Sequence, residues 1–103
     1  MPKFDFVYHG GSMPETPEEG QKQMAQWVAW LQGLGSDVVD GGNPVGASRT
    51  VFADRVADDG GANPASGYSL INASDMDDAV AKAKGCPILQ NGGNVEVAEV
   101  IEM

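Results

Sequence analysis

Hydrophobic and polar residues alternate along residues 3–9, where the aromatic side chains of Phe4, Phe6 and Tyr8 fall on one side and Asp5 and Val7 on the other. A period of two residues is typical of a β-strand. Four further short segments, rich in apolar or β-branched residues, predict strands: residues 36–40, 48–54, 68–72 and 94–103.

Two segments carry the spacing of an amphipathic helix. Residues 16–19, Thr-Pro-Glu-Glu, combine an N-cap, a proline at the first helical position and a glutamate at N3, so a helix is predicted to start there and to end at Gly35. A second helix is predicted from Ser74 to Gly85. The predicted buried stripes are Met24, Trp27, Val28, Leu31 and Leu34 in the first helix and Met76, Ala79, Val80 and Ala83 in the second. Trp30 lies off the first stripe, so we expect it to be partly exposed or to contact something other than the core of its own helix.

This order of elements predicts one α+β domain over residues 1–103. The arrangement is a ferredoxin-like βαββαβ sheet with an extra hairpin strand, covered on one face by two helices. Apolar residues stand on both faces of the sheet, as Phe6 and Val7 do in the first strand and Val97 and Ala98 in the last. Because monomers rarely expose a large apolar patch, we expect a homodimer, a dimeric α+β barrel, whose facing sheets enclose a cleft.

Residues 58–67 are built almost wholly from turn-forming residues. We expect a mobile surface loop there.

Charge and composition narrow the classes of partner. Fifteen acidic residues against six basic ones give a net charge of −9, which disfavours nucleic acids and anionic membrane surfaces. No apolar run approaches the roughly 20 residues of a membrane helix, and residues 1–11 lack a basic leader, so we expect a cytoplasmic protein. Cys86 is the only cysteine and has no ligand partners near it in sequence; we expect no disulfide, no metal and no cofactor.

Four short runs in the second half of the chain together resemble a known family. They are Gly67-Tyr68-Ser69-Leu70-Ile71, Asp75-Met76-Asp77-Asp78-Ala79, Gly85-Cys86-Pro87 and Gly93-Asn94-Val95-Glu96-Val97. In order and spacing they resemble the YCII-related family, including its DGPF-type branch. The glycine loop after the first strand, the helix start at residues 16–19 and the turn at residues 41–42 agree, so the resemblance covers nearly the whole chain. It implies a dimeric α+β barrel with a small-molecule cleft in which a histidine and an aspartate act.

Two positions depart from that family. The DGPF-type signature is replaced by Asp59-Gly60-Gly61-Ala62, without the phenylalanine and the charged residues that follow it in that branch. The family's histidine lies in the first helix, where this chain has Gln23, Met24 and Gln26. That histidine therefore has no counterpart here.

Three residues are candidates for proton transfer. His9 ends the first strand beside two glycines, where it can act as a general base or simply make one backbone hydrogen bond. Asp40, before Gly41-Gly42, is the carboxylate candidate, with a turn-capping role as the alternative. Asp5 faces either solvent or the dimer cleft, and burial there would raise its pKa.

Two further residues are candidates for ligand binding. Tyr8 can line the cleft, although its position also suits the core. Arg49, with Arg55, can neutralise an acidic substrate or form ordinary surface ion pairs. Cys86 is explained by packing, and the glycine pairs are turn residues, because neither a lysine nor the phosphate-loop spacing follows them.

These residues support two hypotheses of function. The first is a cofactor-free enzyme of lyase or isomerase type that uses His9 with Asp40 or Asp5 in the dimer cleft. The second is a non-catalytic module that binds a small ligand or a protein in the same cleft, including a regulatory role.

Overall fold

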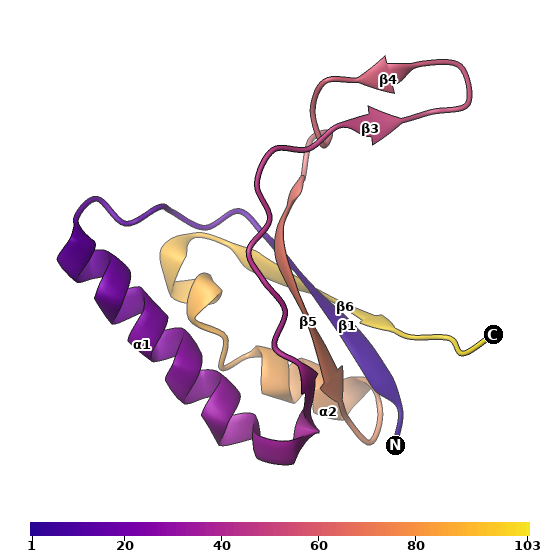
Figure 1. The fold of residues 1–103 in the computed structure, drawn as a ribbon. Coiled ribbons are helices and arrows are strands. Elements are labelled where there is room, and N and C mark those ends of the chain that lie inside the picture. Colours follow the sequence, from indigo (N-terminus) through magenta and orange to yellow (C-terminus); the bar gives the residue numbers. More distant parts are fainter.

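The computed structural model describes all 103 residues and consists of a four-stranded antiparallel sheet, two α-helices and a separate β-hairpin (Figure 1). The elements in chain order are β1 (Lys3–His9), α1 (Pro17–Leu34), the short 3₁₀ helix η1 (Gly35–Asp37), β2 (Val38–Asp40), β3 (Thr50–Val51), β4 (Val56–Ala57), β5 (Ala65–Asn72), α2 (Met76–Ala83), the 3₁₀ helix η2 (Pro87–Asn91) and β6 (Asn94–Glu99). The predicted α+β class is confirmed.

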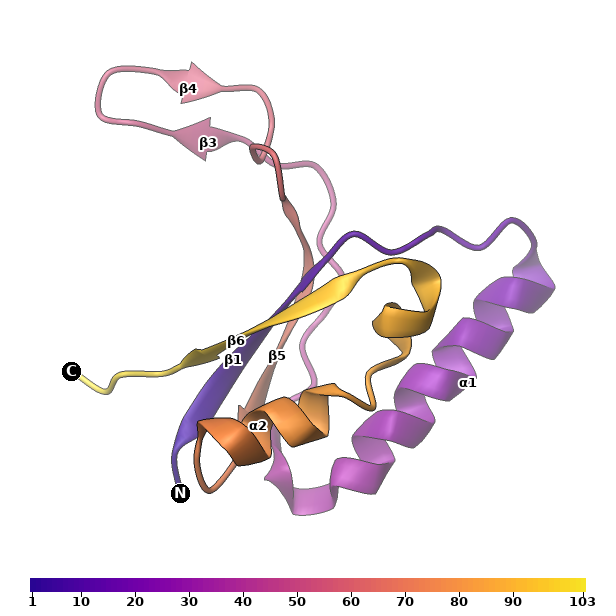
Figure 2. The same ribbon diagram turned by 180° about the vertical axis from the view of Figure 1, so that it is seen from behind.

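The sheet has the strand order β2-β5-β1-β6, and each neighbouring pair is antiparallel. It follows that β1 and β2 run parallel with β5 between them, and that β5 and β6 run parallel with β1 between them. One helix joins each parallel pair, α1 for the first and α2 for the second. Both helices lie on the same side of the sheet (Figures 1 and 2).

The core lies between the helices and one face of the sheet. Phe4 and Phe6 are fully buried there, and the buried cluster also contains Ile71, Ala79 and Cys86. These side chains meet because Phe4 stands opposite Ile71 on β5, and because residues at every second position of a strand share a face. The predicted alternation of β1 is confirmed.

Helix α1 starts where the sequence predicts it to start. The Thr16 Oγ1 atom accepts a hydrogen bond from the backbone N–H of Glu19 at 3.1 Å, and Pro17 is the first helical residue. Helix α2 differs by one residue, since its N-cap is Asp75 rather than Ser74: the Asp75 carboxylate accepts from the N–H of Asp78 at 2.8 Å. Asp75 takes the N-cap position instead of Ser74 because aspartate is at least as good a cap as serine and because its negative charge is stabilised at a helix N-terminus.

The buried face of α1 agrees with the predicted one at Trp27 and Leu34 but differs at Met24, Val28 and Trp30. Trp27, Trp30 and Leu34 pack against the core, whereas Met24 is 66% exposed and Val28 is 43% exposed. The Trp30 ring stacks on Phe6, with ring centroids 6.3 Å apart, and its Nε1–H donates to the carbonyl of Lys82 at 3.1 Å. Large indole rings with a bonded N–H bury more apolar surface than Met24 and Val28 do, so they set the rotation of the helix.

The predicted strand at residues 48–54 is shorter than expected and does not belong to the main sheet. Only Thr50 and Val51 are extended, and they pair with Val56–Ala57 in a hairpin that is not part of the main sheet. The backbone N–H of Phe52 donates to the carbonyl of Arg55 at 2.7 Å and closes the turn between them. We call residues 49–57 the arm. The predicted loop 58–67 is shorter than expected, because β5 already starts at Ala65.

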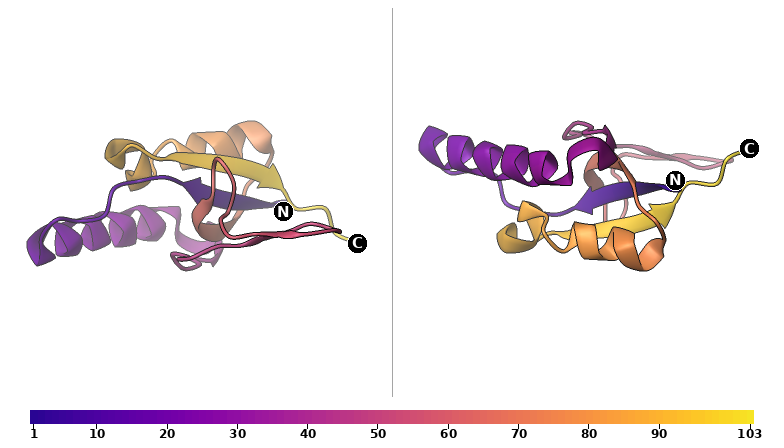
Figure 3. Two further views of the ribbon diagram at one scale, coloured as in Figure 1. Left: turned by 90° about the horizontal axis from the view of Figure 1, so that it is seen from above. Right: turned by 90° about the horizontal axis from the view of Figure 1, so that it is seen from below.

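The arm stands away from the body, on the side of the sheet opposite the helices (Figures 1 and 2). Seen from above and from below, it extends in the same direction as the C-terminal end of the chain (Figure 3). No helix of the structure is long and apolar enough to cross a membrane.

The face of the sheet that the helices leave bare carries both apolar and charged residues. Register places Asp5 between Leu70 and Ala98, and Val7 between Tyr68 and Glu96. We call these six residues the open sheet face. Tyr68 is 38% exposed, and Val7, Leu70 and Ala98 are half-buried although no helix covers them.

Candidate functional site

His9 ends β1 at the point where the chain turns away from the sheet. Gly10 and Gly11 follow it with φ angles of 74° and 87°, a region that glycine enters without the Cβ clash of other residues. The pairing of β1 with β5 also shifts register between Tyr8 and His9. Only 6% of the His9 surface is exposed. The single histidine of the chain is therefore covered by its surroundings.

Both ring nitrogens of His9 face hydrogen-bond acceptors. Its Nε2 atom lies 3.0 Å from Oε1 of Glu96, and its Nδ1 atom lies 3.2 Å from the backbone oxygen of Pro64. A carboxylate and a carbonyl only accept, so both contacts are hydrogen bonds only when both nitrogens carry a proton. The geometry therefore favours the positively charged imidazolium.

The electrostatics of the site agree with this geometry. The hydrogen bond to Glu96 raises the pKa of His9 above its ordinary value of 6.5, and the backbone carbonyls of Pro64 and Asn63 act in the same direction. Burial of the ring opposes the shift but is the smaller effect. His9 thus keeps its proton to a higher pH than a free histidine does.

Glu96 was not among the residues that the sequence singled out. It lies on β6, one strand away from His9 in space but 87 positions away along the chain, and its side chain is 61% exposed. Two observations together would have identified it. Glu96 stands between Val95 and Val97 in the last predicted strand, and that strand pairs with the first one. The strand pattern alone does not give that pairing.

Tyr8, predicted as a ligand-binding residue, lies in the core. Its ring is 4% exposed and packs edge-on against Trp27, with ring centroids 4.9 Å apart. Its hydroxyl donates to Ser69 Oγ at 2.7 Å, and Ser69 in turn donates to the carbonyl of Gly41 at 2.7 Å. Burial raises the pKa of Tyr8 well above its ordinary value. Tyr8 therefore faces the helices and not the open sheet face.

The two predicted carboxylates lie apart from His9. Asp5 is half-buried on the open sheet face, and its side chain makes no hydrogen bond or ion pair. Asp40 is exposed, and its Oδ1 atom accepts from the backbone N–H of Gly42 at 2.8 Å, which is the turn-capping geometry. No hydrogen bond joins either carboxylate to His9. The structure thus pairs His9 with Glu96 rather than with Asp5 or Asp40.

Arg49 and Arg55 both lie in the arm. Arg49 is exposed and forms no ion pair. The Arg55 guanidinium stacks over the Phe52 ring at 3.8 Å and lies 3.7 Å from Asp54, with both charged groups exposed. Exposed pairs of this kind contribute little to stability.

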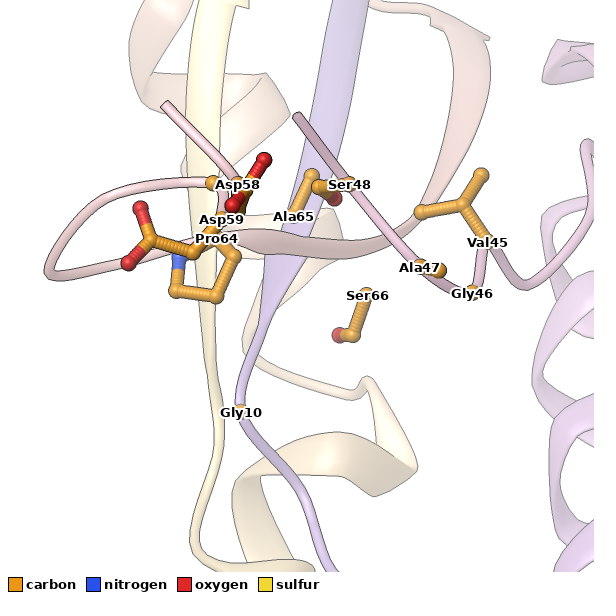
Figure 4. Close-up of a pocket in the computed structure, with 11 residues that line it drawn as sticks. Gly10, Val45, Gly46, Ala47, Ser48, Asp58, Asp59, Pro64, Ala65 and Ser66 are labelled. Carbon is orange, nitrogen blue, oxygen red and sulfur yellow. The ribbon is translucent and has the colours of Figure 1, made fainter. Parts of the chain in front are cut away.

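A pocket of about 430 Å³ lies at the base of the arm (Figure 4). Its walls are Gly10, residues 45–48, residues 58–60 and residues 64–66. Gly10 follows His9 directly, and Pro64 is the residue whose carbonyl faces the His9 ring. We call this hollow the arm pocket. It lies within one chain, whereas the sequence pointed to a cleft between two subunits.

The chemistry of the arm pocket comes from small side chains and two carboxylates. Asp58 and Asp59 are exposed at its wall, and the lining contains no lysine or arginine. The Oγ atom of Ser66 is buried without a hydrogen-bond partner in the chain, and Figure 4 shows this side chain between Gly10 and Ala47. A buried hydroxyl without a partner costs roughly 1–3 kcal/mol.

Neither a metal centre nor a reactive thiol accompanies this pocket. No group of three or more histidine, cysteine, aspartate or glutamate side chains is placed to hold a metal ion. Cys86 is buried in the core, and burial raises the pKa of its thiol to about 11. A thiol that stays protonated at neutral pH is a poor nucleophile.

Comparison with known proteins found no matching family model, no matching curated protein and no matching solved structure.

Proposed function

We propose that the protein is a small-molecule-binding module whose ligand occupies the arm pocket. The observation that carries this proposal is the Ser66 hydroxyl, which is buried at the wall of the pocket without a partner. A ligand atom that bonded to this hydroxyl would remove the free-energy cost of leaving it unpaired. Ligand binding would then stabilise the fold.

The charges around the pocket define the class of ligand. Asp58 and Asp59 supply acceptor oxygens, although one oxygen of Asp59 already accepts from the N–H of Gly61 at 3.0 Å. With no basic residue in the lining and a net charge of −9 on the chain, an anionic ligand is disfavoured. The ligand we propose is a small polar molecule with a protonated amine or several hydroxyl donors.

The contacts of His9 support a structural role for this residue. A general base needs a nitrogen with a free lone pair, and both nitrogens of His9 face acceptors that favour protons on them. The ring ties the end of β1 to β6 and to the segment that leads into β5. This arrangement supports the non-catalytic hypothesis more than the enzyme.

A second candidate function is acid–base chemistry of lyase or isomerase type. The observation that favours it is the shared wall: Pro64 both accepts from His9 and lines the arm pocket. A substrate that displaced the Pro64 carbonyl would meet a charged Nδ1–H, a general acid that Glu96 orients. Because the hydrogen bond to Glu96 raises the pKa of His9, the ring keeps this proton to a higher pH than a free histidine does.

The experiment that tests both candidates is NMR with two sets of probes, small amines such as ethanolamine and spermidine, and small carboxylates such as acetate and succinate. We expect the amines to shift the amide signals of Gly10, Ala65 and Ser66. Ser66→Ala and Asp58→Asn should weaken that effect, while Asp77→Asn, which removes an exposed carboxylate of α2, should not.

The binding proposal would be contradicted if the carboxylates, and not the amines, shifted these amide signals. It would also be contradicted if the amines left the amide signals of the pocket residues unchanged. A bound amine that also displaces the His9 ring from Pro64, seen as a change in the His9 ring signals, would favour the acid–base candidate over the structural role.

For the architecture, we propose the ferredoxin-like arrangement in a dimeric α+β barrel. The strand order β2-β5-β1-β6 and the two parallel pairs joined by helices support the ferredoxin-like part, with the arm as the extra hairpin. The apolar members of the open sheet face support a homodimer. The relation to the YCII-related family rests on the order of sequence motifs and stays a prediction.

A further inference from the structure

The arm exposes three large apolar side chains. Val51 is 76% exposed, Val56 is 54% exposed and Phe52 is 42% exposed. The hairpin pairs only with itself and is separate from the main sheet. Because an isolated two-stranded hairpin is marginally stable in water, the arm needs a surface to pack against.

The surface area of the chain indicates the size of the missing contact. The chain exposes 6929 Å², whereas a compact monomer of its mass, 10.7 kDa, exposes about 5,500 Å². The excess of about 1,400 Å² is larger than the roughly 800 Å² that each partner buries in a protein–protein interface of standard size. An arm that packed on a partner would account for this excess.

The charges of the arm and of the open sheet face are complementary. The arm holds both arginines of the chain, Arg49 and Arg55, against one acidic residue, Asp54. The open sheet face holds two carboxylates, Asp5 and Glu96. The chain has only six basic residues and a net charge of −9, and the arm holds two of the six. The arm of another copy can therefore supply positive charge to the carboxylates of that face.

We propose that the arm of one copy lies across the open sheet face of a second copy, and that the exchange is symmetric. Phe52 and the two valines of the arm then pack on Val7, Tyr68, Leu70 and Ala98, while the arginines face Asp5 and Glu96. A two-fold axis makes the contact occur twice, because each copy supplies one arm and one sheet face. This inference rests on the homodimer proposed above and names the elements that hold it together.

The contact also joins the partner's arm to the His9 site. Glu96 is bonded to His9 through Oε1, yet its side chain is 61% exposed. An arginine from the partner's arm can therefore reach the carboxylate without breaking the bond to His9. The site of one copy is then completed by a residue of the other.

A charge-reversal experiment tests the exchange. The arm variant is Arg49→Glu with Arg55→Glu, and the sheet variant is Asp5→Lys with Glu96→Lys. Each alone brings like charges together, so we expect each to dimerise about tenfold more weakly or worse in sedimentation velocity. Mixing the two restores opposite charges at both contacts, so the mixture should form a heterodimer with the affinity of the unchanged protein.

Two further variants keep the test interpretable. Lys22→Glu with Lys84→Glu changes the net charge as much as the arm variant does, but at exposed sites on the helix side, and should leave the dimer unchanged. Asp5→Lys alone keeps the bond between His9 and Glu96 intact, so it replaces the sheet variant if circular dichroism shows that variant unfolded.

The outcomes separate this inference from the homodimer itself. If the arm variant dimerises like the unchanged protein, or if mixing restores nothing, the arm exchange is wrong and the sheets pair without it. If the unchanged protein is monomeric, the homodimer is wrong as well.

Discussion

The Nε2 atom of His9 lies 3.0 Å from the Oε1 atom of Glu96, although the two residues are 87 positions apart in the chain. The other nitrogen of the same ring faces the carbonyl of Pro64. One imidazolium thus links the end of β1, the strand β6 and the segment that enters β5. Its protonation decides whether both side-chain contacts are hydrogen bonds, and one of them is to Pro64, which lines the arm pocket.

The first prediction concerns the titration of His9. Its pKa, measured from ring proton signals by NMR, should lie above 6.5 in the unchanged protein. Glu96→Gln replaces the charged acceptor by a neutral one, so the pKa should fall toward the ordinary value or below it. A pKa at or below 6.5 in the unchanged protein would show that the ring is not held as the structure has it.

The second prediction is the pH dependence of stability. Because the pKa of His9 is raised on folding, its contribution is fully present below about pH 6.5 and is lost as pH rises through the higher folded value. Against His9→Asn, the unchanged protein should be more stable by about 1 kcal/mol at pH 6, since the partner is exposed. Urea unfolding of both proteins between pH 5 and pH 9 measures the difference, which should shrink with rising pH. A difference that grows with pH would contradict it.

The third prediction concerns the buried face of α1. Trp30→Ala removes the ring that stacks on Phe6 and the hydrogen bond to Lys82, and should lower the free energy of unfolding by about 3 kcal/mol. Met24→Ala, at a 66% exposed position of the same helix, should change it by less than about 0.5 kcal/mol. Equal effects of the two changes in urea unfolding would favour the rotation of α1 that the sequence predicts.

The fourth prediction concerns the turn after β2. Gly42 has a φ angle of 72°, and an added Cβ would run into the backbone oxygen of Tyr68, so Gly42→Ala should destabilise the fold by about 3 kcal/mol or more. Gly46→Ala meets no atom within 4 Å and is the matched control. Thermal unfolding should show a clear fall in melting temperature for the first change and almost none for the second.

Local features of this fold could be predicted from the sequence because they depend on neighbouring residues. The cap and proline at Thr16-Pro17 set the start of α1, and the alternation of Phe4 and Phe6 sets the faces of β1. The exposed Met24 and the packed Trp30 could not be distinguished in this way. Both lie on overlapping helical faces, and only the partner surface, Phe6 and the Lys82 carbonyl, selects between them.

Features that depend on strand pairing could not be derived from spacing alone. Val51 and Val56 are β-branched residues of the kind found in sheet strands, yet they pair with each other in a hairpin outside the main sheet. The spacing of apolar residues does not show which strands pair. The link between His9 and Glu96 depends on the same pairing of first and last strands. For this reason the sequence identified the histidine of the site and missed its carboxylate.

The measurement that tests the central claim most directly is the mass of the unchanged protein in solution, determined by sedimentation velocity over a wide range of concentration. A second subunit over the open sheet face predicts a species of twice the chain mass of 10.7 kDa, with dissociation only on dilution. A single species of the chain mass at the highest concentration would show that the arm and the open sheet face stay exposed to water, and would contradict the account.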